Sequence, residues 1–189
     1  KVPQKEIVKA FDVSLILYAE HSFNVSTFTA RTITSSLSDI HGAITGAIAS
    51  LKGPLHGGAN EEVMHMMNKI KKPENALKWI NNALSKKEVV MGFGHRVYKS
   101  GDSRVPTMEK YFKNVSRIKS DKKFIKIYNI VKKVMIDKKN IHPNVDYPTG
   151  PTYHLMGFDT DFFTPIFVTS RITGWSAHIM EQHAANKLI

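Results

Sequence analysis

Cysteine is absent from this chain of 189 residues. Without thiols a protein forms no disulfides, has no thiol nucleophile, and holds no zinc knuckle or iron–sulfur cluster through cysteine. Long apolar runs are also lacking, since none approaches the roughly 20 residues that cross a bilayer. The first residues do not resemble a signal peptide. We therefore expect no membrane partner and a location in the cytoplasm or in the mitochondrial matrix.

Acidic residues are scarce relative to basic ones, 16 against 27, which gives a net charge of +11. Eleven basic residues gather between Thr107 and Asn140, where only three acidic residues oppose them. This segment has three interpretations: the solvated face of a helix, a surface beside an anionic small ligand, or a nucleic-acid surface. Apolar residues recur at helical spacing between the lysines (Phe124, Ile127, Tyr128, Val131, Val134 and Met135). The solvated helix face is the simplest interpretation, and we expect no nucleic-acid partner.

Helical periodicity dominates the sequence and strand-like alternation is nearly absent, which predicts an all-α fold. Helices are expected over residues 7–18, 26–51, 63–70, 73–84 and 164–186, with further helices in the basic segment. The helix over 26–51, which Ser26 could cap, has small residues on nearly every side, so we expect it to be buried and closely packed. Loops are expected over 89–95 and 141–148, where glycine and proline interrupt the pattern.

Three candidate catalytic residues, His56, His95 and Asp146, each lie in a glycine- or proline-rich break between expected helices. Loops that rigid helices hold in place often carry catalytic groups. A single loop histidine is nevertheless more often a surface or structural residue, so none of the three identifies a site by itself. The nine histidines show no His-Glu-x-x-His pattern and no other standard zinc spacing, and we expect no metal site.

Four segments occur together in the order and approximate spacing of the citrate synthase family, and the resemblance runs from about Asp12 to Ile189. They are Leu55-His56-Gly57-Gly58-Ala59-Asn60, Gly92-Phe93-Gly94-His95-Arg96-Val97-Tyr98-Lys99, Gly101-Asp102-Ser103-Arg104 and Asn144-Val145-Asp146. Within the family, the chain most resembles 2-methylcitrate synthases. That resemblance is carried by Gly101-Asp102-Ser103-Arg104-Val105-Pro106-Thr107-Met108, Tyr147-Pro148-Thr149-Gly150-Pro151 and Thr173-Gly174-Trp175.

The resemblance implies an acyltransferase that condenses an acyl-CoA with oxaloacetate and then hydrolyses the resulting thioester to release coenzyme A. Propionyl-CoA is the expected acyl donor and 2-methylcitrate the product, with acetyl-CoA as a further donor. The citrate synthase of the tricarboxylic acid cycle is the alternative. A basic helical module that binds nucleic acid and a catalytically silent subunit are two more distant hypotheses. Coenzyme A enters as part of a substrate, so we expect no cofactor.

The resemblance also implies roles for residues at matching positions. Asp146 would be the base that removes the thioester α-proton, and His56 would donate a hydrogen bond to the forming enolate oxygen. His95 would polarise or protonate the keto oxygen of oxaloacetate. The oxaloacetate-binding set would be His21, His95, Arg104 and Arg171, because the planar fork of arginine suits carboxylates. Coenzyme A would bind Lys99 and the backbone of Val90, Met91, Gly92, Phe93 and Gly94.

Two of these assignments depend on the resemblance, since the local sequence alone also fits a structural ion pair for Arg171 and a structural role for His21. The implied fold has two helical lobes with a substrate cleft between them. The large domain would comprise residues 1–55 and 152–189, and the small domain residues 56–151. Family members are dimers, so we expect a homodimer with the 26–51 helix at its interface.

Family chains are longer at the front, and past the position of Ile189 they continue into a segment whose arginine reaches the oxaloacetate of the partner subunit. The resemblance therefore implies that part of the large domain and one carboxylate ligand are missing from these 189 residues. We expect this chain alone to be inactive or very weakly active.

Overall fold

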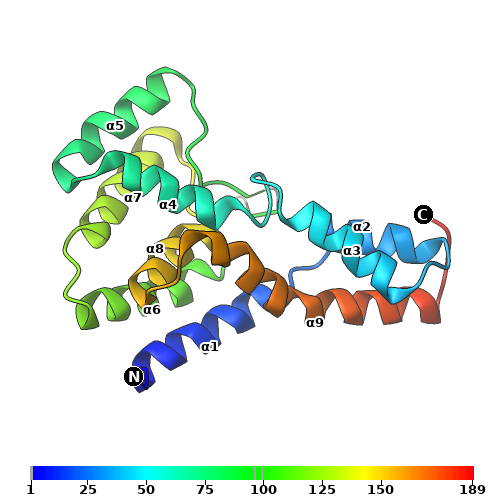
Figure 1. Cartoon of the computed structure of the whole chain (residues 1–189). Coiled ribbons are helices and arrows are strands. Elements are labelled where there is room, and N and C mark those ends of the chain that lie inside the picture. Colours follow the sequence, from blue (N-terminus) through cyan, green and yellow to red (C-terminus); the bar gives the residue numbers. More distant parts are fainter. Residues whose placement is uncertain (1, 96, 99) are drawn as a thin grey trace. The chain divides into compact units, whose positions relative to one another are not determined.

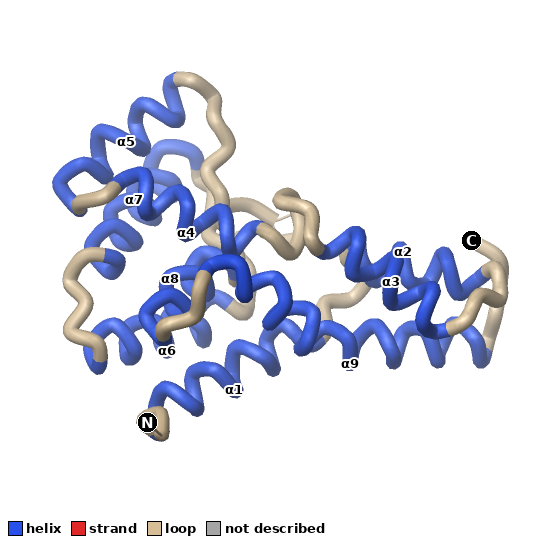
Figure 2. Tube along the Cα trace, in the orientation of Figure 1, coloured by secondary structure: helices blue, strands red, loops and turns tan. Residues whose placement is uncertain are grey.

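The computed structural model describes residues 2–95, 97–98 and 100–189. Within these residues the regular elements are helices and no strand is present (Figure 2), which confirms the predicted all-α fold. In chain order (Figure 1) the elements are α1 (Lys5–Ala19), α2 (Val25–Ser35), α3 (Ile40–Leu51), α4 (Ala59–Ile70), α5 (Pro73–Ser85), α6 (Val105–Ile118), α7 (Phe124–Lys139), α8 (Asp146–Met156), the short 3-10 helix η1 (Thr160–Phe162) and α9 (Phe163–Ala184). No helix in the described ranges is long and apolar enough to cross a membrane.

The helices form two compact units. Unit 1 comprises Lys1–Phe11 and Ala59–Thr160, and unit 2 comprises Asp12–Gly58 and Asp161–Ile189. The predicted domain boundaries differ, since they lie after residues 55 and 151 and assign the first residues to the other domain. Phe11 explains part of the difference, because its ring packs on those of Tyr153 and Phe158 in unit 1. That these units correspond to the two family lobes stays a prediction.

Unit 1 is organised around α8, which packs on α4 and on α6, while α5 packs on α7. Gly150 permits the close contact between α8 and α4, because a Cβ atom there would lie 2.7 Å from the carbonyl oxygen of Asn60. Tyr147 of α8 stacks on Tyr128 of α7, with ring centroids 4.5 Å apart. The apolar face predicted for α7 is buried except for Val134, which is half-buried, and its lysines are mostly exposed, which confirms an amphipathic helix.

In unit 2, α2 and α3 pack on each other and on α9. Gly174 brings α9 against the end of α1, because a Cβ atom there would lie 2.3 Å from the carbonyl oxygen of Ala19. The hydroxyl of Ser170 donates a hydrogen bond to the carbonyl of Leu15. These contacts fix the part of α9 that carries Arg171.

The prediction of one helix over residues 26–51 is wrong. α2 ends at Ser35 and α3 begins at Ile40. Between them Leu37 adopts a left-handed φ of 67°, which interrupts a helix. The side chain of Asp39 then accepts a hydrogen bond from the N–H of Gly42 at 2.8 Å and caps α3.

The prediction that Ser26 caps the helix at its N-terminus is also wrong. Asn24, and not Ser26, caps α2, since its side-chain oxygen accepts a hydrogen bond from the N–H of Thr27 at 3.1 Å. Ser26 instead lies inside the first turn and is fully buried. Its hydroxyl is therefore available for tertiary contacts.

The loop predicted over 141–148 is shorter than expected, because α8 begins at Asp146. Pro148 lies in the first turn, where a helix tolerates proline because the N–H groups have no partner within the helix. The side chain of Asn144 accepts a hydrogen bond from the N–H of Asp146 at 3.1 Å and ties down the helix start. The turn geometry thus places Asp146 on a rigid element rather than in a loop.

Candidate active site

The glycine-rich loop before His95 is hydrogen-bonded to the segment before Asp146 in unit 1. The N–H of Gly94 donates to the carbonyl of His142 at 2.8 Å, and the N–H of Asn144 donates to the carbonyl of Gly92 at 2.9 Å. The side-chain amide of Asn144 also donates to the carbonyl of Gly94 at 3.0 Å. Gly92 has a φ of 83°, which favours glycine. Two breaks some 50 residues apart in the sequence are therefore neighbours.

His95 is positioned as a neutral hydrogen-bond donor. Its Nδ1 accepts a hydrogen bond from the N–H of Val97 at 3.1 Å, so the proton of the neutral ring lies on Nε2. Burial lowers the pKa of His95; the negative charge of Asp102 opposes this shift and the positive charge of Arg104 reinforces it. At neutral pH the ring therefore offers an N–H group without a full positive charge.

Arg104, predicted to bind a carboxylate, is held by a carboxylate of its own chain. Its Nε–H and Nη2–H groups donate to the two oxygens of Asp102 at 3.0 and 2.8 Å. Asp102 also accepts a hydrogen bond from the N–H of Val145 at 3.0 Å. Burial would raise the pKa of Asp102, but the hydrogen bonds and charge of Arg104, aided by the Val145 N–H, lower it. Asp102 is therefore ionised at neutral pH.

Asp146 directly follows Val145 and is half-buried at the start of α8. Unit 1 thus links three predicted site residues, His95, Arg104 and Asp146, through Asp102 and the glycine loop. A pocket of about 180 Å³ lies beside His95 and Asp102. It is lined by Gly94, His95, Tyr98, Gly101, Asp102, Asn140, Ile141, His142 and Pro143.

In unit 2, His56 is fixed by Ser26. The N–H of Ser26 donates to His56 Nε2 at 3.2 Å, and the Ser26 hydroxyl oxygen lies 2.8 Å from the same nitrogen. That oxygen is held in turn by the indole N–H of Trp175 at 3.1 Å and lies 2.7 Å from Oδ1 of Asn24. The proton of neutral His56 is therefore on Nδ1.

Two cationic or potentially cationic side chains act on His56 from within unit 2. Burial lowers the pKa of His56 from 6.5 to about 4, with further contributions from the charges of Arg171 and His21. Arg171 is 1% exposed, donates through Nε to the carbonyl of Tyr18, and lies over the Phe167 ring at 4.8 Å. Unit 2 thus brings together His21, His56 and Arg171, and it keeps His56 neutral at neutral pH.

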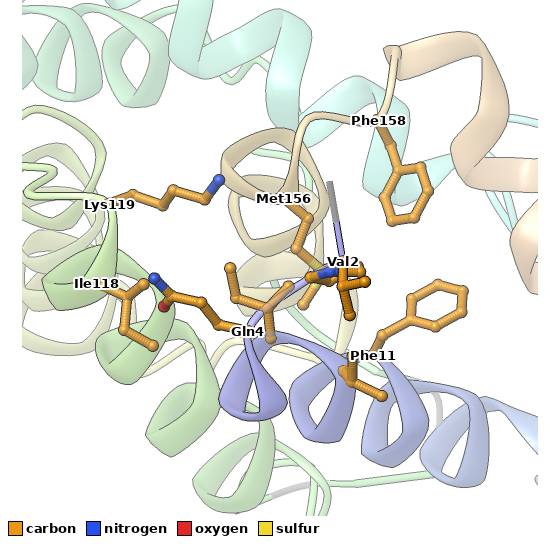
Figure 3. Close-up of a pocket in the computed structure, with 10 residues that line it drawn as sticks. Val2, Gln4, Phe11, Ile118, Lys119, Met156 and Phe158 are labelled. Atoms are coloured by element: carbon orange, nitrogen blue, oxygen red, sulfur yellow. The ribbon is translucent and has the colours of Figure 1, made fainter.

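A larger, apolar pocket of about 580 Å³ lies elsewhere in unit 1 (Figure 3). It is lined by Val2, Pro3, Gln4, Ile7, Val8, Phe11, Ile118, Lys119, Met156 and Phe158, a set that contains none of the predicted site residues. We place the candidate site at the smaller pocket, because polar groups suited to proton transfer gather there. Among the described residues, no group of three or more His, Asp or Glu side chains is arranged to hold a metal ion.

Several predicted assignments stay predictions. Lys99 lies outside the described residues. Val90 and Met91 lead into the glycine loop, and the binding of coenzyme A by residues 90–94 stays a prediction. The convergence of His56 with His95 and Asp146, which belong to different units, also stays a prediction.

Ser26, Asp102 and Asn144 contact the candidate residues or their neighbours, but the sequence predicts no role for them in the site. Asp102 could have been found, because it stands two residues before Arg104 in a glycine-containing turn. Ser26 and Asn144 carry no comparable sequence signal, since the contact of Ser26 with His56 spans 30 residues and that of Asn144 with Gly94 spans 50.

These features define an all-helical protein with two groups of histidine, arginine and aspartate side chains suited to carboxylate binding and proton transfer. The sequence model described as "Citrate synthase, C-terminal domain" matches residues 1–189. The chain therefore belongs to the citrate synthase family.

Similar proteins include both a 2-methylcitrate synthase and a citrate synthase. The chain is 60% identical to 2-methylcitrate synthase 2 of Corynebacterium glutamicum, covering 96% of this chain and 48% of that protein. It is 56% identical to a citrate synthase of Mycolicibacterium smegmatis, covering 100% and 50% of the two chains. The chain thus spans about half the length of the curated relatives it matches.

A solved structure supports the fold. Citrate synthase from Thermoplasma acidophilum, in a ternary complex with carboxymethyl coenzyme A and oxaloacetate, superposes with a TM-score of 0.88 and 38% identity. The match covers 100% of this chain and 52% of that one. The chain therefore has the same fold class as a known citrate synthase.

Proposed function

We propose that this chain supplies the C-terminal domain of a 2-methylcitrate synthase. The reaction would condense propionyl-CoA, and also acetyl-CoA, with oxaloacetate, and hydrolysis of the thioester would release coenzyme A. The observation that carries the proposal is that His56 and His95 each accept a backbone N–H on one ring nitrogen. In the neutral ring the proton is therefore on the other nitrogen, Nδ1 in His56 and Nε2 in His95.

The chemistry requires such donors because the α-proton of a thioester is only weakly acidic. Asp146 would take this proton while Nδ1–H of His56 stabilises the negative charge that develops on the thioester oxygen. The enolate carbon would then attack the keto carbon of oxaloacetate. The keto oxygen, polarised by Nε2–H of His95, would become a hydroxyl group by taking a proton. Water would finally attack the thioester carbonyl, and the coenzyme A thiol would leave.

Substrate binding would use basic side chains of both units. Oxaloacetate carries two carboxylates, and Arg104, Arg171 and His21 are the residues proposed to bind them. Residues 90–94 and Lys99 are proposed to bind coenzyme A. The reaction as written forms one carbon–carbon bond and hydrolyses one thioester with no net oxidation or reduction, so we propose that it needs no cofactor.

A homodimer is part of the proposal, with α2 and α3 at the interface. Both helices expose large apolar side chains, with Phe28 49%, Ile40 41% and Ile48 37% exposed. Exposed apolar groups of this size favour association with another surface. Light scattering of the full-length protein at micromolar concentration tests this, and a monomeric mass would contradict it.

The citrate synthase of the tricarboxylic acid cycle is the alternative, supported by the relative of that name at 56% identity. The two acyl donors differ by one methylene, which is worth only about 1–3 kcal/mol in an apolar pocket. We expect both thioesters to react, with kcat/KM higher for propionyl-CoA. A strong preference for acetyl-CoA would favour the alternative.

The test is release of free thiol by the full-length protein with oxaloacetate and either thioester. Thiol release that depends on oxaloacetate supports the proposal. The absence of thiol release with both thioesters would overturn it. In that case steeply salt-dependent binding of duplex DNA would support the nucleic-acid hypothesis instead.

A further inference from the structure

Asp102 is a buried acidic side chain to which the proposed mechanism gives no role. Its side chain is completely buried in the turn before α6. Removing a carboxylate from water is costly unless charged or polar groups take the place of water. The groups that surround Asp102 therefore determine what it does.

Four donors meet this one carboxylate. Oδ1 accepts hydrogen bonds from the backbone N–H and from Nε–H of Arg104, both at 3.0 Å. Oδ2 accepts hydrogen bonds from Nη2–H of Arg104 at 2.8 Å and from the N–H of Val145 at 3.0 Å. A carboxylate has about four acceptor positions, so these donors saturate it and fix its orientation.

Three of the donors belong to Arg104, two residues after Asp102, and the fourth belongs to Val145, 43 residues after it. Arg104 immediately precedes α6, and Val145 immediately precedes Asp146 at the start of α8. A shift of the carboxylate would move the guanidinium of Arg104 and the backbone that presents Asp146 at the same time. A displacement of about 1 Å in groups that position the substrate can lower the rate of reaction about a hundredfold.

We propose that Asp102 is a positioning residue for the condensation: one buried carboxylate holds Arg104 and the backbone entering Asp146 in a fixed relation. This inference rests on the proposed function, because Arg104 and Asp146 act on substrate only there. Asp102 would act through these two residues, because its own oxygens already accept hydrogen bonds from four donors of the protein.

A purely structural role is the competing explanation, since Asp102 also accepts a backbone N–H at the start of a helix. Asp121 provides the matched control in the same unit. Its carboxylate accepts the N–H groups of Lys123, Phe124 and Ile125 at 3.0 to 3.1 Å and so begins α7. Asp121→Asn removes one negative charge at a helix start away from the candidate site residues.

The kinetic experiment compares Asp102→Asn and Asp121→Asn in the full-length protein. Asparagine keeps one acceptor oxygen but replaces the other by an NH₂ group that would face a donor. We expect kcat/KM for oxaloacetate to fall about tenfold to a hundredfold in D102N relative to D121N. The KM for the acyl-CoA should stay within about twofold. Asp102 acts through Arg104, which would bind oxaloacetate, and through Asp146, which would remove the α-proton, and neither is proposed to bind coenzyme A. Equal losses in the two variants would overturn the proposal.

A second measurement needs no variant and covers the case in which D102N does not fold. In protein labelled with ¹⁵N at valine and isoleucine, saturating oxaloacetate should shift the Val145 amide signal and leave that of Ile125 unchanged. Both amides donate to a carboxylate at 3.0 Å, but only the one from Val145 shares its acceptor with Arg104. An unchanged Val145 signal would overturn the proposal.

Failure of the proposed function is distinguishable from failure of this inference. Wild-type protein that neither binds oxaloacetate nor releases thiol would refute the function and, with it, the positioning role. Wild-type protein that turns over, together with D102N that behaves as D121N, would refute the positioning role alone.

Discussion

The Nε2 atom of His56 lies 3.2 Å from the backbone nitrogen of Ser26, which donates a hydrogen bond to it. A protonated ring could not accept this bond, so the contact and the burial of His56 both favour the neutral form. The proton on Nδ1 is then the one that the proposed mechanism uses. Ser26 is itself fixed by Trp175 and Asn24, so the tautomer of His56 is built into unit 2.

The first prediction concerns the pH dependence of stability. The unfolded chain protonates His56 near pH 6.5, whereas the folded chain does so only near pH 4, so acid favours unfolding between these values. Between about pH 7 and about pH 4.5, wild type should lose about 2–3 kcal/mol more of its free energy of unfolding than His56→Gln. Urea denaturation at both pH values measures this. The same pH dependence in both proteins would contradict it.

Ser26→Ala should destabilise the protein. The substitution leaves the buried indole N–H of Trp175 without its hydroxyl acceptor, and such a loss costs about 1–3 kcal/mol. Ser36→Ala is the control, because the exposed hydroxyl of Ser36 donates a hydrogen bond to the carbonyl of Ile33 in the preceding helix. This substitution should change the free energy of unfolding by no more than about 0.5 kcal/mol. Equal midpoints of urea denaturation for the two variants would show that the Ser26 hydroxyl contributes little.

Gly57→Ala should destabilise unit 2 and disturb His56, its neighbour. A Cβ atom at Gly57 would lie 2.4 Å from Cγ and 2.6 Å from the carbonyl oxygen of Leu51. Overpacking of this kind costs about 1–3 kcal/mol. Gly53→Ala in the same turn is the control, since its Cβ atom would meet nothing closer than 3.5 Å. Thermal denaturation should separate the two variants, and a stability of G57A at or above that of G53A would be inconsistent with this packing.

The helices with clear sequence signals were predictable. Pro73 opens α5 as expected, and the apolar periodicity of α7 matches its buried face. The break between α2 and α3 at Leu37 was not predictable. Its left-handed backbone is usually adopted by glycine or asparagine, and leucine gives no such signal in the sequence. The start of α8 was hidden by Pro148, which is equally compatible with a loop and with the first turn of a helix.

The sequence names the candidate site residues, but it does not indicate their contacts. Glycine-bounded segments and their order in the chain identified His56, His95 and Asp146 through a family resemblance. Two of the bonds that hold the site residues span 30 and 43 residues, those of Ser26 with His56 and of Asp102 with Val145. Such pairs are defined by the tertiary packing of helices, which the periodicity of a single segment does not encode.

The most direct test of the central claim is α-proton exchange on the acyl-CoA in heavy water. The full-length protein would be mixed with propionyl-CoA and a dicarboxylate that resembles oxaloacetate but lacks its keto group, so that proton removal is seen without condensation. Wild type and the exposed-site control Asp159→Asn should exchange the α-protons at equal rates. Asp146→Asn should exchange them about a hundredfold to ten-thousandfold more slowly. Exchange by D146N at the wild-type rate would contradict the assignment of Asp146 as the base.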